Sequence, residues 1–134
     1  MNRHEKRLHD LLTVADDMSE FDKHKHAAAI YIGNKMISFG VNQLKSHPLQ
    51  KKFGINGDAI YLHAEVDAIR NALKRVDIDE LRNATLYVTK SKRGVASMSK
   101  PCPGCQRAIM HFGIKNVFWT NTAGIEATVG PSGS

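Results

Sequence analysis

The chain has 134 residues, of which 42% are hydrophobic and 24% are charged, and none of its apolar runs is long enough to cross a bilayer. This composition is typical of one compact globular domain and excludes fibrous, disordered and membrane-spanning proteins. The formal net charge of +6 favours anionic partners such as nucleotides, nucleic acid or acidic proteins, although a basic solvated surface explains it equally well.

The first predicted element is an amphipathic helix. Apolar residues recur at helical spacing from Leu8 to Met18, and Asn2 with Glu5 is suited to a capping box before them. The first ten residues are polar and lack the apolar stretch of a secretory signal, so we expect a cytoplasmic protein.

A hairpin and a loop are expected next. Residues 27–32 are continuously apolar, Gly33-Asn34 interrupts them, and β-type residues continue as far as Val41, which is typical of two antiparallel strands joined by a turn. Residues 43–61 contain one proline and two glycines and predict mostly loop.

The second half of the chain alternates helices with strands. We predict helices over residues 63–76 and 101–112, strands at 85–89 and 117–119, and a basic surface loop over 90–100. Such alternation requires crossover connections and therefore a sheet that contains parallel strands.

The end of the chain is expected to complete the same domain. Residues 125–129 can form one more edge strand, which a short connecting turn would force to be antiparallel. We therefore expect a single domain over residues 1–129 and a disordered tail over residues 130–134.

Two short motifs carry residues suited to metal chemistry, and each lies where a predicted helix begins. They are His63-Ala64-Glu65 and Pro101-Cys102-Pro103-Gly104-Cys105. A helix N-terminus carries free N–H groups and a partial positive charge, which lower the pKa of a nearby thiol. Two thiolates and one neutral imidazole, from His63, Cys102 and Cys105, form a tetrahedral zinc set that leaves one position for water.

Glu65 is placed to move protons at such a site. Zinc lowers the pKa of its bound water and so provides hydroxide near neutral pH, which is suited to attack on a substrate carbon. Glu65 follows the histidine by two residues and can accept the proton of that water, and it can then deliver protons in turn to a ring nitrogen and to a departing amine. The pattern therefore predicts a catalytic zinc site.

The two cysteines are also compatible with a redox role or with a structural metal site. The pair could be a redox site of the thioredoxin type, although residues 104–130 contain no proline to supply the cis-proline of such folds. The cysteines could instead form a structural zinc site with His111, which would leave His63 and Glu65 without a role.

Together the motifs resemble those of the zinc deaminase superfamily, which includes cytidine, deoxycytidylate and tRNA-adenosine deaminases. The resemblance runs from about residue 27 to 120 and includes HAEVDAI, PCPGCQRAI and FGIKNVFWT. It implies an α/β fold, a cytidine deaminase-like three-layer α/β/α sandwich with a mixed central sheet, and a Zn²⁺ cofactor in one zinc deaminase domain. The cysteine segment resembles the deoxycytidylate and tRNA group, whereas residues 121–134 suit the antiparallel ending of nucleoside deaminases.

The resemblance also implies contacts with a substrate. Asn42 would contact the sugar or base, and the backbone N–H of Ala64 would meet the base carbonyl. Lys45 and His47 follow Asn42 closely and could meet a phosphate, although a solvated loop explains them somewhat better.

Several further residues are weaker candidates for substrate contact. Phe53 or Tyr61 could flank the base, but core packing is the commoner role of such residues. The basic segment 90–100 should border the pocket mouth, where it would attract phosphates or simply be solvated. His24 and His26 have no motif support, so we expect both at the surface.

The predicted activity is hydrolytic deamination of cytosine in a nucleoside or nucleotide, with a deoxycytidylate-like or cytidine-like substrate. The first alternative is deamination of adenine or cytosine bases in tRNA or single-stranded DNA, which the basic charge favours. The second is a zinc-stabilised nucleic-acid-binding module without catalysis, and Glu65 argues against it. We expect no membrane partner, and family resemblance implies a homo-oligomer.

Overall fold

The computed structural model describes residues 2–21, 24–44, 48–53, 61–121 and 124–131 of the chain. The elements in these ranges are α1 (Arg3–Met18), β1 (Lys25–Ile32), β2 (Lys35–Val41), α2 (Pro48–Phe53), α3 (Ala64–Ala72), the 3₁₀ helix η2 (Ile78–Asn83), β3 (Ala84–Lys92), β4 (Val95–Ser97), α4 (Pro103–His111), β5 (Asn116–Asn121) and β6 (Gly124–Pro131). None of the helices in these ranges has the length and apolar character that crossing a membrane requires.

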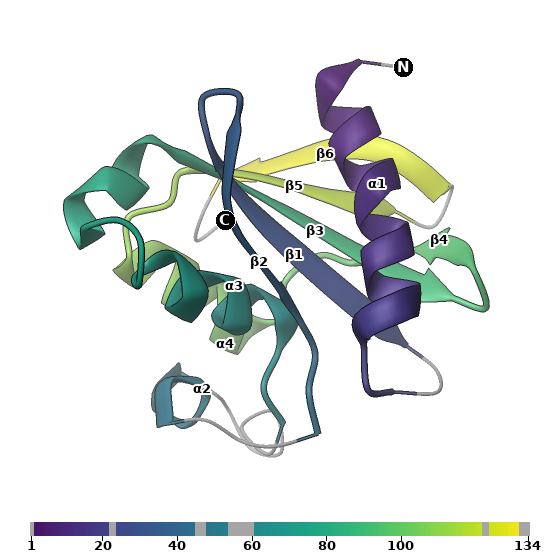
Figure 1. Ribbon diagram of the computed structural model, residues 1–134, viewed down its shortest axis with the longest axis horizontal. Coiled ribbons are helices and arrows are strands. Elements are labelled where there is room, and N and C mark those ends of the chain that lie inside the picture. Colours follow the sequence, from purple (N-terminus) through teal and green to yellow (C-terminus); the bar gives the residue numbers. More distant parts are fainter. Residues whose placement is uncertain (1, 22–23, 45–47, 54–60, 122–123, 132–134) are drawn as a thin grey trace.

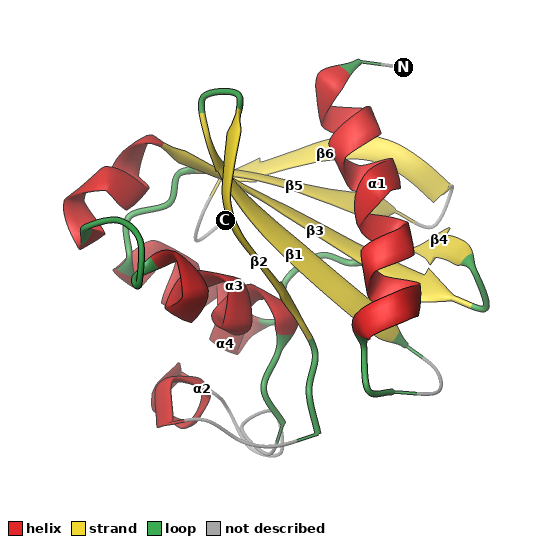
Figure 2. Ribbon diagram, viewed as in Figure 1, coloured by secondary structure: helices red, strands yellow, loops and turns green. Residues whose placement is uncertain are grey.

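The strands of the described ranges form one mixed sheet (Figures 1 and 2), with the order β2-β1-β3-β5-β6 and with β4 paired to the end of β3. Strands β3 and β5 are parallel, and every other pair is antiparallel. The predicted crossover and the predicted antiparallel edge strand are therefore confirmed. Gly130 and Pro131 belong to β6 and pair with β5, and residues 132–134 of the predicted tail lie outside the described residues.

The predicted hairpin is also confirmed. Strands β1 and β2 pair from Ala27 opposite Val41 to Ile32 opposite Lys35, with Gly33-Asn34 as the turn between them. Gly33 has a φ of +61°, a conformation that a residue without a Cβ adopts at little cost.

Three other segments differ from their predictions. Residues 90–100 are mostly not a loop, because β3 continues to Lys92 and β4 returns along it after a turn in which Arg93 and Gly94 both have positive φ. The segment 43–61 contains the short helix α2. The helix predicted over 63–76 ends at Ala72, and the 3₁₀ helix η2 follows before β3.

Helices cover both faces of the sheet, as Figure 1 shows, with α1 on one face and α3 and α4 on the other. The alternation of side chains along β1 explains the two layers of packing. Ala27 and Ala29 are buried against α1, whereas Ala28 and Ile30 are buried in the cluster that includes α3 and α4. The predicted three-layer α/β/α sandwich is therefore confirmed.

Helix α3 lies unusually close to β2 at Gly40. A Cβ at this position would lie 2.4 Å from the backbone N of Ala68 and 2.7 Å from the backbone O of Ala64. Both atoms belong to the helix backbone, so no side-chain rotation can make room. The missing side chain of Gly40 therefore sets the distance between the sheet and the first turns of α3.

Replacing Gly40 with alanine should force α3 away from the sheet. We expect the Gly40→Ala variant to lose about 2–3 kcal/mol of unfolding free energy in urea titrations, since overpacking of a close-packed contact costs this much. Gly33→Ala is the matched control, because a Cβ there meets nothing within 4 Å and the positive φ alone costs about 1 kcal/mol. An equal or smaller loss in Gly40→Ala would contradict the close approach.

Candidate functional site

The N-termini of α3 and α4 converge on one cluster of possible metal ligands. His63 is the N-cap of α3, Cys102 is the N-cap of α4, and Cys105 lies in the first turn of α4. The Nδ1 atom of His63 lies 3.2 Å from Sγ of Cys105 and 3.5 Å from Sγ of Cys102. One ligand atom from each of the three residues lies within 4.8 Å of the others, so a single ion can contact all three.

A buried carboxylate fixes the first turn of α3 to the end of β2. Asp67 is 3% exposed, and its Oδ2 accepts hydrogen bonds from the backbone N of Val41 at 3.1 Å and from Nε2 of Gln43 at 2.9 Å. Its Oδ1 pairs with the Arg70 guanidinium at 2.7 Å. These bonds hold the helix start, and with it His63, in place relative to the sheet.

A hydroxyl network fixes the start of α4 in the same way. Ser99 Oγ donates to the backbone O of Val88 at 2.8 Å and accepts from the backbone N of Thr120 at 2.8 Å. Ser99 thereby ties the segment before the cysteines to the middle of β3 and to the end of β5. Gln106 Nε2 donates to the backbone O of Pro101 at 2.8 Å, which links the first turns of α4 to the segment that precedes the helix.

The two thiols share their protons unequally. The pKa of Cys102 is lowered to about 4, first by a hydrogen bond with Cys105 and further by His63, against the opposing effect of burial. The pKa of Cys105 is raised by the hydrogen bond with Cys102 and by burial. The pair therefore holds one thiolate and one thiol at neutral pH, and a cation between the sulfurs would replace the remaining proton.

Glu65 lies beside this cluster with an unused oxygen. The residue is 4% exposed, and no hydrogen-bond partner contacts its Oε1 atom in the structure as described. Burial is the main cause that raises the pKa of this carboxyl. A buried polar atom without a partner is costly unless a ligand or water completes it, so Oε1 is suited to accept a hydrogen bond from a bound ligand or water.

These observations fit a zinc ion. Two sulfurs and one imidazole nitrogen are the donors that zinc prefers, and three protein ligands leave a fourth position. The Glu65 carboxyl, with its unpartnered Oε1, interacts with the Cys105 side chain and so lies beside these ligands. His111 is the last residue of α4, about 12 Å along the helix from its first residue at a rise of 1.5 Å per residue. A structural site formed by both cysteines and His111 is therefore excluded.

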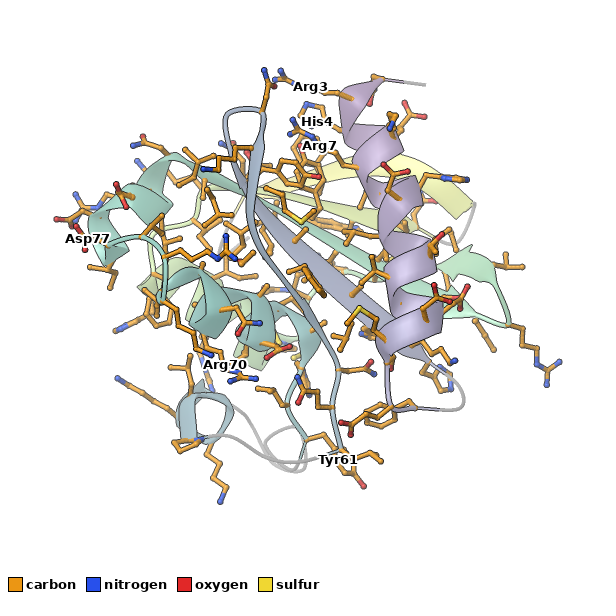
Figure 3. The ribbon with its side chains drawn as sticks, in the orientation of Figure 1. Arg3, His4, Arg7, Tyr61, Arg70 and Asp77 are labelled. Carbon is orange, nitrogen blue, oxygen red and sulfur yellow. The ribbon has the colours of Figure 1, made fainter. Side chains whose placement is uncertain are left out.

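A pocket of about 280 Å³ opens beside the cluster. Its described lining consists of aromatic, imidazole, amide and aliphatic side chains from three segments: Phe21, His24, His26, Asn42, Tyr61, Leu62 and His63. Tyr61 contacts Phe21 edge to face, with ring centroids 5.5 Å apart. Figure 3 shows Tyr61 at the opposite end of the molecule from His4 and Arg7 of α1.

A larger hollow of about 610 Å³ lies over β2 and α3, where Met36, Phe39 and Arg70 line it. None of its lining residues belongs to the cluster of His63, the two cysteines and Glu65. The smaller pocket is therefore the candidate site, because it shares His63 with the possible metal ligands.

The structure brings most of the predicted site residues together. His63, Cys102 and Cys105 form the cluster, Glu65 interacts with Cys105 beside it, and Asn42 lines the adjoining pocket. Ala64 is the first residue of α3, so its N–H is one that the helix itself leaves without a partner. Lys45 and His47 lie outside the described residues, as does the side chain of Phe53.

His24 is exposed, which confirms its predicted surface position, although it also lines the pocket. His26 is half-buried in the pocket wall, so its predicted surface position is wrong. The alternation of side chains along a strand could have indicated a buried position for His26, because it faces the same side of β1 as the buried residues Ala28 and Ile30. The alternation places His26 in the pocket only when the face of the sheet covered by α3 and α4 is known.

Comparison with known proteins identifies the class to which this fold and this cluster belong. Residues 1–121 match the family described as the cytidine and deoxycytidylate deaminase zinc-binding region, and the chain belongs to this family. Its cofactor is accordingly zinc, which the His63, Cys102 and Cys105 group can hold. A search of curated protein sequences found no match.

Solved structures of deaminases share the fold. A cytidine deaminase from Burkholderia pseudomallei is 19% identical, with a TM-score of 0.66 and with 99% of this chain and 94% of that chain covered. A dCMP deaminase from the cyanophage S-TIM5 is 21% identical, with a TM-score of 0.62 over 91% of this chain and 86% of that chain. A guanine deaminase from Bacillus subtilis is 25% identical, with a TM-score of 0.53 over 91% of this chain and 66% of that chain.

Proposed function

We propose that the protein is a zinc-dependent hydrolase that removes the exocyclic amino group from cytosine in a nucleoside or nucleotide. In this proposal His63, Cys102 and Cys105 hold the zinc ion and Glu65 transfers protons. The observation that carries it is the unpartnered Oε1 of the buried Glu65 beside a three-ligand cluster. A structural zinc site needs four protein ligands and has no use for such an oxygen.

The proposed chemistry assigns a separate task to each group. Zinc bound by the three ligands would lower the pKa of a water molecule and so supply hydroxide at neutral pH. Glu65 would accept a proton from such a water, and its raised pKa suits a carboxyl that holds a proton before passing it to a ring nitrogen or the departing amine. The Ala64 N–H is available to the base carbonyl at the start of α3.

The pocket supports a small substrate. Its volume of about 280 Å³ is close to the lower limit for ligand sites, and the aromatic pair of Phe21 and Tyr61 offers faces against which a base can pack. The cyanophage relative has been crystallised in complex with dCMP and dUMP. We further propose that residues 1–129 form one deaminase domain that contains this pocket, and that the protein is a homo-oligomer.

A second candidate is deamination of a base in tRNA or single-stranded DNA. The observation that favours it is the exposed turn between β3 and β4, where Lys92 and Arg93 follow one another in a chain of net charge +6. Cations at this position could hold a phosphate backbone that leads toward the cysteines. Such binding should weaken steeply as the salt concentration rises.

Ammonia release by the zinc-loaded protein tests these proposals. We expect turnover of at least one substrate among cytidine, deoxycytidine and deoxycytidine monophosphate. Guanosine and adenosine are assayed beside them as nucleosides of the alternative bases. Activity on single-stranded DNA or RNA alone would replace the first candidate with the second. The absence of turnover on every substrate, with zinc bound and the fold intact, would contradict both and favour a binding module.

A further inference from the structure

His26 lies where the sheet meets the pocket. It is the second residue of β1, in register with Lys90 of β3. Because side chains alternate along a strand, His26 faces the same side of the sheet as Ala28 and Ile30, which pack in the core with α3 and α4. This is the layer that holds His63, and both histidines line the same pocket.

The imidazole of His26 is neutral at physiological pH. Burial is the main reason that its pKa is lowered to about 4, and the nearby charges of Lys90, His63 and His24 lower it further. A neutral imidazole offers one N–H donor and one nitrogen acceptor. The hydrogen bonds seen at this residue within the described ranges involve its backbone, so both ring atoms are available to a ligand.

Asn42 holds the backbone that carries this imidazole. Its side-chain Oδ1 accepts from the backbone N of His26 at 3.0 Å and from the hydroxyl of Ser19 at 2.5 Å. Its Nδ2 donates to the backbone O of His24 at 2.9 Å. The carbonyl oxygen of Asn42 is thus occupied inside the protein, and the bonds fix the segment that carries His26 before any substrate arrives.

We propose that His26 is a specificity-determining residue whose imidazole hydrogen-bonds an uncharged polar group of the bound nucleoside, with Asn42 as the residue that positions it. This inference rests on the proposed deaminase function and deepens it. A neutral donor and acceptor suit a carbonyl, amino or hydroxyl group, which the base and the sugar both contain. Replacing the imidazole with an apolar side chain would remove both ring nitrogens and leave the substrate's polar group buried without a partner.

Steady-state kinetics of His26→Ala tests the proposal. For whichever of cytidine, deoxycytidine and deoxycytidine monophosphate the protein deaminates, we expect kcat/KM to fall by about 10-fold to 100-fold, chiefly through KM, with zinc content unchanged. His26→Asn should recover part of the loss because its amide retains a donor and an acceptor. His9→Ala is the matched control, since His9 is exposed on α1, and should match the wild type.

Assays with free cytosine show whether His26 contacts the base or the sugar of the substrate. A large effect of His26→Ala on the nucleosides, with little effect on cytosine, assigns the contact to the sugar, and equal effects assign it to the base. An unchanged kcat/KM in His26→Ala, with an active wild type, overturns the His26 role but keeps the deaminase. An inactive wild type overturns both.

A spectroscopic measurement keeps the proposal testable if the alanine variant does not fold. In long-range ¹H–¹⁵N spectra of zinc-loaded Glu65→Gln protein, the ring nitrogens of His26 should indicate a neutral imidazole at pH 7. Addition of cytidine or deoxycytidine should shift them. Saturation of the protein by either nucleoside without a shift of these nitrogens would overturn the contact.

Discussion

The Glu65→Gln variant should lose about 100-fold to 10,000-fold in kcat, because proton transfer by a positioned carboxylate contributes on the order of 10²–10⁴-fold and the amide cannot accept the proton. Its zinc content should equal that of the wild type, because Glu65 is not among the three clustered ligands. The midpoint of thermal unfolding should not fall, since Gln replaces a carboxyl whose burial opposes ionisation. Ammonia release, metal analysis and calorimetry together measure the three quantities.

Glu80→Gln is the matched control for this variant. Glu80 is exposed on η2, where its carboxylate accepts from the backbone N of Asp77 at 2.9 Å in a capping box, and Gln supports the same box. This control should keep full activity. A Glu65→Gln protein that retained more than about a tenth of the wild-type kcat would contradict general acid–base transfer by Glu65.

Much of the fold could be predicted because the signals for its elements are local in the sequence. The apolar spacing from Leu8 to Met18 defines α1, and Gly33-Asn34 defines the hairpin turn. The hairpin of β3 and β4 could not be predicted in this way, because its basic and small residues do not resemble a buried strand. Its turn depends on Arg93 and Gly94 with positive φ, and the pairing is fixed by contacts rather than by apolar pattern.

The candidate site divides in the same way. His63, Glu65 and the cysteines could be predicted because each motif is local and each caps a helix. The part played by His26 in the pocket wall could not be predicted, because it depends on a hydrogen bond from its backbone to Asn42, sixteen residues further along the chain. The position of α3 also depends on Gly40, because the backbone of this helix packs directly against it. The sequence around Gly40 does not indicate this contact, since the helix comes from a later part of the chain.

Replacing Cys105 with alanine should remove zinc from the protein. The variant leaves one sulfur and one imidazole, so we expect zinc affinity to fall by about 100-fold or more, and deaminase activity to disappear with the metal. Competition with a chromogenic chelator measures the affinity. The His111→Ala variant is the control, because His111 lies at the far end of α4, and it should bind one zinc ion as the wild type does.

Zinc binding by the wild type should also depend on pH, with a sign that the two thiols determine. Between about pH 5 and 8 the metal-free protein already holds Cys102 as thiolate, because its pKa is about 4, whereas Cys105 keeps its proton because its pKa is raised. Both sulfurs must be thiolates to bind zinc, so binding releases the Cys105 proton and affinity falls as the pH falls. Calorimetry in buffers of different ionisation enthalpy should detect about one proton released per zinc ion by this pair. Proton uptake, or tighter binding at lower pH, would mean that Cys105 is not a ligand and would return the cysteines to the redox interpretation.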